Sequence, residues 1–173
     1  MTTDRWRSRI VGHAEVPPSD LTANPRNWRE HPKAQRDALA GVLDSVGWVG
    51  EIVVNKRTGL VVDGHLRLTL AVERAEPSVP IKYIDVSEDE EALILATLDP
   101  IAAMAETDAG ALERLIEELG EQDGMVADLL DAIAEEHGID PPHFAPVDVD
   151  EQSRLDTRAP VTCPNCGEEF RPR

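Results

Sequence analysis

The chain has 173 residues, 41% hydrophobic and only 3% aromatic, so we expect one domain with an aliphatic core plus appendages. No apolar run reaches the roughly 18 residues of a membrane span, and the N-terminus lacks an apolar signal segment, which favours a cytoplasmic protein with no membrane partner. The formal net charge of −17 argues against strong nonspecific DNA binding by the whole chain.

The charge is divided unevenly along the chain. Residues 1–84 hold 12 Lys and Arg against 10 Asp and Glu, whereas residues 85–156 hold 2 against 22. The first half is therefore the part that could receive a nucleotide or a nucleic acid strand, and its candidate cations are Arg26, Arg29, Lys33, Arg36 and Arg67. The acidic half either serves as a solvated surface or repels or mimics nucleic acid.

Periodicity and turn residues predict the elements in chain order. They are a strand over 10–16, a helix over 32–46, a hairpin of strands 52–54 and 60–62, a helix over 66–75, a strand over 79–84, and helices over 88–98, 108–119 and 125–137. Gly47 is expected to end the first helix, and the sequence from Ser87 to Glu90 is typical of a capping box. This pattern predicts an α+β protein.

The segment from Val61 to Arg67 is an apolar run that stops at Gly64 and continues into the predicted helix. A strand that turns at a glycine into a helix directs free backbone N–H groups to one place, where they attract phosphate. Arg67 and His65 strengthen this anion site, and Asp63 is either a further ligand-binding residue or a local acceptor for the backbone. Ordinary turn chemistry is the alternative interpretation.

A second segment precedes it, with Asn24, Pro25 and Arg26 in sequence and His31 shortly after. The two segments resemble, in order and distance, the boxes of the ParB/sulfiredoxin-like superfamily, over about residues 9–105. Residues 27–32 are similar to the phage and methyltransferase-linked branch. The resemblance implies a small mixed α/β domain that holds nucleotide phosphates at the helix after Gly64, with Asn24, Arg26 and His31 in the same cleft.

The chain departs from this superfamily at informative positions. His65 stands where sulfiredoxin carries cysteine, which excludes sulfinic acid reductase chemistry. Leu66 replaces a second arginine of chromosome-partitioning ParB proteins, and residues 98–101 replace their acid-Asn-x-x-Arg box. These changes count against CTP hydrolysis and clamp closure, although nucleoside triphosphate binding is compatible with them.

The tail carries the two cysteines of the chain, Cys163 and Cys166, which suit a reducing compartment better than a disulfide framework. Their Cys-Pro-Asn-Cys spacing resembles half of a zinc-ribbon knuckle, and zinc needs four ligands. The remaining ligands would come from a second chain in a homodimer, from a partner, or from His137 and His143; an empty knuckle is the alternative.

We therefore expect four parts: a ParB/sulfiredoxin-like domain over 1–105, an acidic helical extension over 106–138, a linker over 139–160 and a flexible knuckle tail over 161–173. Three functions fit. The first is a nucleotide-binding accessory protein in DNA modification, partition or phage genome functions, partnered by DNA or a DNA-modifying enzyme. The second is a nuclease or nucleotide hydrolase that uses Asp63, His65 and Arg67 with a divalent metal. The third is an adaptor that docks a partner through its acidic helices and cysteines.

Overall fold

The computed structural model of the protein describes residues 5–139, 161–162 and 169–170. The chain divides into two compact units, residues 1–139 and 140–173. In the second unit, β5 (Val161–Thr162) pairs antiparallel with β6 (Glu169–Phe170). The predicted linker over 139–160 falls almost wholly outside the described residues, and Cys163, Cys166 and His143 fall outside them entirely.

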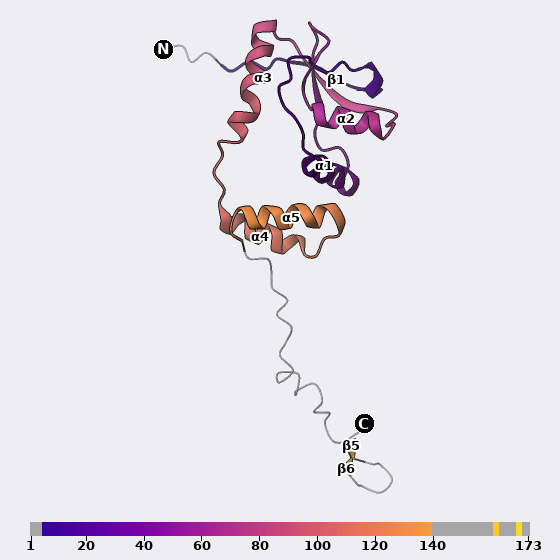
Figure 1. Cartoon of the computed structure of the whole chain (residues 1–173), viewed down its shortest axis with the longest axis vertical. Helices are drawn as coiled ribbons and strands as arrows, with labels where there is room; N and C mark the ends of the chain where they lie inside the picture. The colour runs from indigo at the N-terminus through magenta and orange to yellow at the C-terminus, as the bar shows by residue number, and fades with distance from the viewer. Residues whose placement is uncertain (1–4, 140–160, 163–168, 171–173) are drawn as a thin grey trace. The chain divides into compact units, whose positions relative to one another are not determined.

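The first unit is built on a four-stranded mixed sheet with the order β1-β4-β2-β3 (Figure 1). Its strands are β1 (Ile10–Val16), β2 (Ile52–Asn55), β3 (Val61–Asp63) and β4 (Val79–Ile84). The central pair, β4 and β2, is parallel, and the two outer pairs are antiparallel. All four predicted strands are confirmed, and with the helices they confirm the α+β class.

Helices complete the first unit. They are the short η1 (Pro18–Asp20), α1 (Lys33–Val46), α2 (His65–Glu73), α3 (Glu88–Ala102), α4 (Ala109–Leu119) and α5 (Gly124–Glu136). None of the described helices is long and apolar enough to cross a membrane. The predicted helices are confirmed, with most ends shifted by one or two residues.

The helix ends show why most boundaries could be predicted. Ser87 and Glu90 form the expected capping box, with Ser87 N–H donating to the Glu90 carboxylate over 2.7 Å. Gly47 follows α1 with φ of 83°, which favours glycine. The prediction that α3 ends at residue 98 was wrong, because α3 includes Pro100. Pro100 lies on an exposed side of the helix, where water can bond the carbonyl that proline leaves without a partner.

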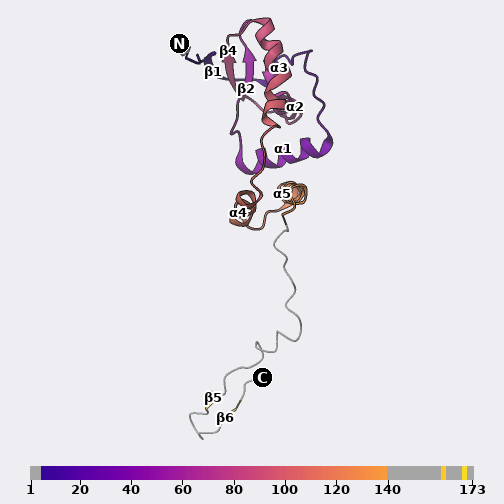
Figure 2. The same ribbon diagram turned by 90° about the vertical axis from the view of Figure 1, so that its left-hand side faces the viewer.

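Each face of the sheet is covered by a helix, and neighbouring residues of β3 show how. Val61 is fully buried in a cluster with Leu68 and Ala71 of α2. Val62 belongs to a second cluster, which includes Leu95 of α3. Adjacent strand residues point to opposite faces, so this alternation places α2 and α3 on the two sides of the sheet (Figure 2). The end of β3, where the site begins, is thereby held from both sides.

Helix α5 packs against α1 at Gly41. A Cβ atom at Gly41 would lie 3.0 Å from the Cβ of Met125, so a side chain there would fit only if Met125 moved by a few tenths of an ångström. Gly41 is the one buried residue of α1. The contact brings the acidic part of the chain against the α/β part.

Candidate functional site

A cavity of about 370 Å³ lies where the first turn of α2 meets α1 and α3. The loop between η1 and α1 and one residue of α5 complete its wall. Its lining residues are Asn27, Arg29, His31, Gln35, Ala38, Leu39, Val42, Val62, Asp63, Gly64, His65, Leu66, Arg67, Ile94, Leu95, Leu98, Asp99 and Leu129. The wall therefore combines polar and charged side chains with aliphatic ones.

Gly64 makes the turn from β3 into α2. Its φ of 89° and ψ of 22° lie in the left-handed region, and a Cβ there would lie 3.2 Å from the Cα of Ile52. The first hydrogen bond of the helix runs from Leu68 N–H to Gly64 O over 2.9 Å. The N–H groups of residues 65–67 therefore have no acceptor within the helix and open toward its N-terminal end.

Asp63 is a local acceptor for this turn. Its Oδ1 accepts the N–H of Gly64 over 2.7 Å, and the side chain lines the cavity. The carboxylate thus stabilises the turn and also places negative charge next to the helix N-terminus. A bound anion would have to overcome that repulsion.

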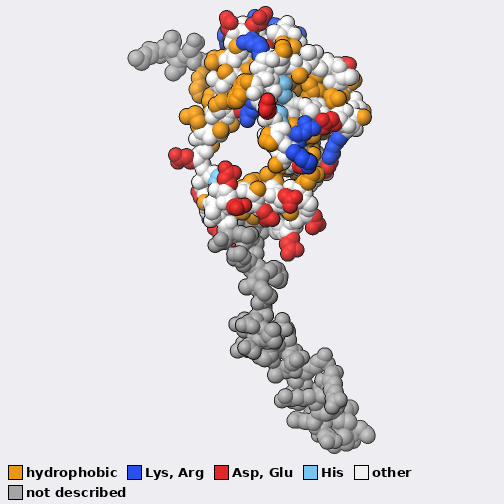
Figure 3. Space-filling model, viewed as in Figure 1, with side chains coloured by type: hydrophobic (Ala, Val, Ile, Leu, Met, Phe, Trp, Pro, Cys, Tyr) orange, Lys and Arg blue, Asp and Glu red, His pale blue; other side chains and the backbone are white. Residues whose placement is uncertain are grey.

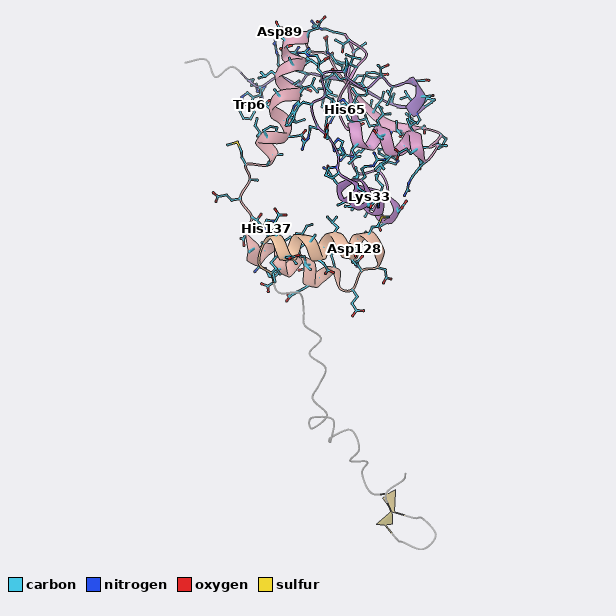
Figure 4. All side chains as sticks on the ribbon, viewed as in Figure 1. Trp6, Lys33, His65, Asp89, Asp128 and His137 are labelled. Carbon is cyan, nitrogen blue, oxygen red and sulfur yellow. The ribbon has the colours of Figure 1, made fainter. Side chains whose placement is uncertain are left out.

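His65 is the first residue of α2 (Figure 4) and lines the cavity. Its Nε2 accepts the backbone N–H of Asn24 over 3.4 Å. Burial lowers the pKa of His65, and His31 lowers it further, against the opposing effects of Asp63 and the Val61 backbone. The net downward shift of the pKa favours the neutral ring, whose Nε2 acts as a hydrogen-bond acceptor.

Arg67 supplies the cation of the cavity. Its guanidinium lies over Gly50, with Nη2 3.4 Å from the position of a Cβ at that glycine. Within residues 5–139, the Arg67 side chain has neither a hydrogen bond nor an ion pair, although it lines the cavity. Its positive charge is therefore available to a ligand.

The other candidate cations of the α/β part are mostly paired. Arg29 lines the cavity but forms an ion pair with Asp99, and its guanidinium lies 5.8 Å from the centre of the Trp28 ring. Lys33 pairs with Asp37, and Arg36 pairs with Glu73 over 2.6 Å. On the face shown in Figure 3, the α/β part carries Lys, Arg and His side chains together with acidic ones, whereas the side chains over α4 and α5 are mainly acidic.

The structure gathers five of the seven predicted binding residues around the cavity: His31, Asp63, Gly64, His65 and Arg67. His31 comes from the loop before α1, where its Nδ1 lies 3.0 Å from Gln35 Oε1. The remaining two, Asn24 and Arg26, do not line it.

Asn24 is buried outside the cavity wall and is 3% exposed. Its Nδ2 donates to Glu91 Oε1 over 2.8 Å, while its Oδ1 accepts the N–H of Arg26 over 3.0 Å. The Asn24 side chain is therefore engaged within the protein. The side chain of Arg26 is exposed.

The sequence interpretation missed the aliphatic part of the cavity wall and the role of Glu91. Leu39 and Val42 of α1 and Leu98 of α3 form part of this wall, and Leu129 joins it from α5. Helical spacing was the available signal for Glu91, because it stands four residues before the buried Leu95 on the same face of α3. Nothing local in the sequence indicated that α5 reaches the site.

Metal binding at the tail is a prediction on residues outside the described part. Among the residues that the structure describes, no group of three or more His, Cys, Asp or Glu side chains could hold a metal ion. The zinc site at Cys163 and Cys166, and the homodimer it would link, therefore stay predictions.

Comparisons with known proteins give remote structural likenesses. No protein-family model and no curated protein matches the chain. The chain is similar to the C-terminally truncated chromosome-partitioning protein ParB from Caulobacter crescentus complexed with CTP-γ-S, with 20% identity and a TM-score of 0.47 over 74% of this chain and 72% of that one.

Two structures of a pNOB8-like ParB N-domain are also similar. Their identities are 14% and 13%, their TM-scores are 0.40 and 0.47, and the matches cover 92% and 96% of this chain. This chain spans 56% of the length of each of them. At such distances, the case for a binding site rests on the geometry of the cavity itself.

Proposed function

We propose that the cavity binds a nucleoside di- or triphosphate, with a phosphate group at the N-terminus of α2. The observation that carries this proposal is the Arg67 guanidinium, which has no acidic partner in the described part and lines the same cavity as the first turn of α2. Hydrogen bonds from arginine and from helix N-terminal amides are the strong contacts to phosphate in proteins.

The remaining wall supports a ligand larger than phosphate alone. A volume of about 370 Å³ falls in the range of small-molecule sites. The aliphatic residues Leu39, Val42 and Ile94 offer an apolar surface to a base or sugar, and the side chains of Asn27 and Gln35 offer hydrogen bonds. A nucleotide combines both kinds of chemistry with its phosphates.

The two carboxylates of the wall do not exclude an anion. Asp99 is paired with Arg29, so its charge is largely neutralised. Asp63 accepts a hydrogen bond from Gly64, but its charge is not cancelled by an ion pair. We expect affinity to rise when Asp63 is replaced by Asn.

Isothermal titration calorimetry with ATP, CTP and GTP tests the proposal. Arg67→Gln removes the cation and should weaken binding at least about tenfold, since charged hydrogen bonds are worth roughly 1.5–3 kcal/mol. Arg74→Gln is the matched control, because Arg74 caps the other end of α2, where it pairs with Asp44 outside the cavity. Absence of binding by wild type, or equal losses in the two variants, would refute the proposal.

The resemblance of the two sequence boxes to ParB-like proteins supports an accessory role in DNA modification, partition or phage genome functions. In this role the protein binds nucleotide without fast turnover, since the residues at positions 66 and 98–101 depart from the ParB pattern. Metal-dependent turnover of labelled nucleotide or DNA by wild type, lost in Arg67→Gln, would instead favour the nuclease or hydrolase alternative.

A further inference from the structure

Glu91 is a buried carboxylate that the proposed binding of nucleotide does not use. It is 1% exposed, although it belongs to the first turn of α3. Its Oε1 accepts Asn24 Nδ2 over 2.8 Å, and its Oε2 accepts Asn55 Nδ2 and Thr58 Oγ1, each over 2.7 Å. Within residues 5–139 it forms no ion pair, so these neutral donors hold the carboxylate in the interior.

These hydrogen bonds keep the carboxylate ionised. Burial raises the pKa of Glu91, but the donors Thr58 and Asn55 lower it, and the net shift is downward. Asn24 and the charge of Arg26 act in the same direction. A buried anion with this set of donors is costly to disturb, because each donor would lose its acceptor.

The three donors come from segments that frame the cavity. Asn24 belongs to the loop between η1 and α1, which also carries His31, while Asn55 and Thr58 belong to the hairpin that leads through β3 to Gly64. Glu91 itself comes from α3, whose next turns line the cavity with Ile94 and Leu98. A single carboxylate therefore fixes three of the segments around the site relative to one another.

Asn24 connects this carboxylate to the first turn of α2. Its side chain donates to Glu91, and its backbone N–H donates to His65 Nε2 over 3.4 Å. His65 is the residue that opens α2, two positions before Arg67. If Asn24 were displaced, the His65 ring would lose this hydrogen bond. The first turn of α2 would then no longer be held against the loop between η1 and α1.

From this chain of contacts we propose that Glu91 is a positioning residue for the phosphate site: through Asn24 it fixes His65 and the first turn of α2. The effect on ligand affinity rests on the proposed function, whereas the effect on His65 can be measured without any ligand. A failure of the proposed nucleotide binding can thus be distinguished from a failure of the positioning role of Glu91.

Glu91→Gln is the direct test. A glutamine presents one acceptor oxygen and one donor NH₂ group where the carboxylate presented two acceptors, so it cannot satisfy both Asn24 and Asn55. If the oxygen faces Asn55 and Thr58, the NH₂ group opposes the Asn24 amide and displaces it. The His65 pKa, followed by NMR against pH, should then rise, because the ring loses a donor and becomes less buried.

The double variant Asn24→Asp with Glu91→Gln should rescue the site. The carboxylate introduced at position 24 would accept the NH₂ group of the new glutamine side chain and still accept the N–H of Arg26, while the oxygen of that glutamine faces Asn55. The network then keeps one negative charge and every donor keeps an acceptor.

Glu90→Gln is the matched control on the same helix turn. Glu90 pairs with Arg9 over 2.7 Å and does not line the cavity, so its loss should lower stability without moving the His65 titration. Asn24→Ala is the second variant, because it leaves Glu91 bonded to Asn55 and Thr58 while it removes the side chain that links them to the loop. It keeps the test decisive if Glu91→Gln does not fold.

The expected result is a raised His65 pKa in Glu91→Gln and Asn24→Ala and a wild-type titration in Glu90→Gln. Restoration in the double variant is read from nucleotide affinity, because the carboxylate at position 24 itself raises the His65 pKa, as Asp63 does. Affinity for the nucleotide that wild type binds should fall about tenfold in the first two variants and recover in the double variant. A folded Glu91→Gln or Asn24→Ala protein with the wild-type His65 titration would overturn the inference. So would an equal shift in Glu90→Gln.

Discussion

Gly64 controls the path of the backbone into the site. Alanine there meets the Cα of Ile52 at 3.2 Å in addition to the left-handed φ of 89°. We expect Gly64→Ala to lower the free energy of unfolding by about 2–3 kcal/mol, since strain and crowding act together. Gly59→Ala is the control, because Gly59 has φ of 71° but no atom within 4 Å of the added Cβ. If urea denaturation shows that both variants lose the same free energy of unfolding, crowding against Ile52 does not contribute to the loss.

The ion pair of Glu90 with Arg9 should make the free energy of unfolding depend on pH in the acidic range. The hydrogen bond from Arg9, followed by that from Ser87, lowers the pKa of Glu90 from 4.5 to about 2. The folded protein thus binds a proton at Glu90 less readily than the unfolded chain. The stability that Glu90 contributes is complete above pH 4.5 and is lost as the pH falls toward 2.

Urea denaturation between about pH 6 and pH 3 measures this loss, with both pH values chosen to span most of the titration. Glu90→Gln should show a shallower decline than wild type, since glutamine does not titrate. Glu88→Gln, on the same turn but without an ion pair among the described residues, should decline as wild type does. If Glu90→Gln also follows the wild-type curve, the pair does not contribute to acid sensitivity.

At the scale of whole elements, the sequence predicted what depends on neighbours in the chain. The strands, the glycine turn at Gly64, the capping box of Ser87 and the role of Asp63 as a local acceptor all follow from local chemistry. The hydrogen bond between Asn24 and Glu91 does not follow from local chemistry, and neither does the position of Leu129 in the cavity wall. They depend on contacts between segments that are distant in the sequence, which spacing rules cannot supply.

The contact of α5 with α1 offers a test at the same scale. Gly41→Leu adds a branched side chain where even a Cβ lies 3.0 Å from Met125, so it should push α5 away from α1. Amide hydrogen exchange over residues 124–136 should then accelerate, while exchange in β2 stays unchanged. Ser45→Leu, at an exposed position of α1, is the control. Unchanged exchange in the Gly41 variant would show that the packing tolerates the added volume.

For the whole molecule, the acidic surface is the dominant long-range feature. Four exposed glutamates on and after α4 can be changed to glutamine without touching the core: Glu113, Glu117, Glu118 and Glu121. This fourfold change should strengthen binding of a DNA duplex at low salt and have little effect at high salt, because screening shortens the reach of exposed charges. Fluorescence anisotropy over a salt series measures it, and unaltered binding at low salt would show that these helices do not repel DNA.

The network around Glu91 also has a consequence for the order of folding. Glu91 joins partners that stand 67 and 36 positions earlier in the chain, and neither Asn24 nor Asn55 can find this acceptor until α3 has docked. Contacts of such long range cost loop-closure entropy before they stabilise anything. During synthesis, the hairpin and α2 emerge before Glu91 does. The contact between Asn24 and the first turn of α2 is therefore supported by Glu91 only after α3 has been synthesised. We therefore expect the proposed phosphate site to become structured only after the β-sheet and α3 are in place.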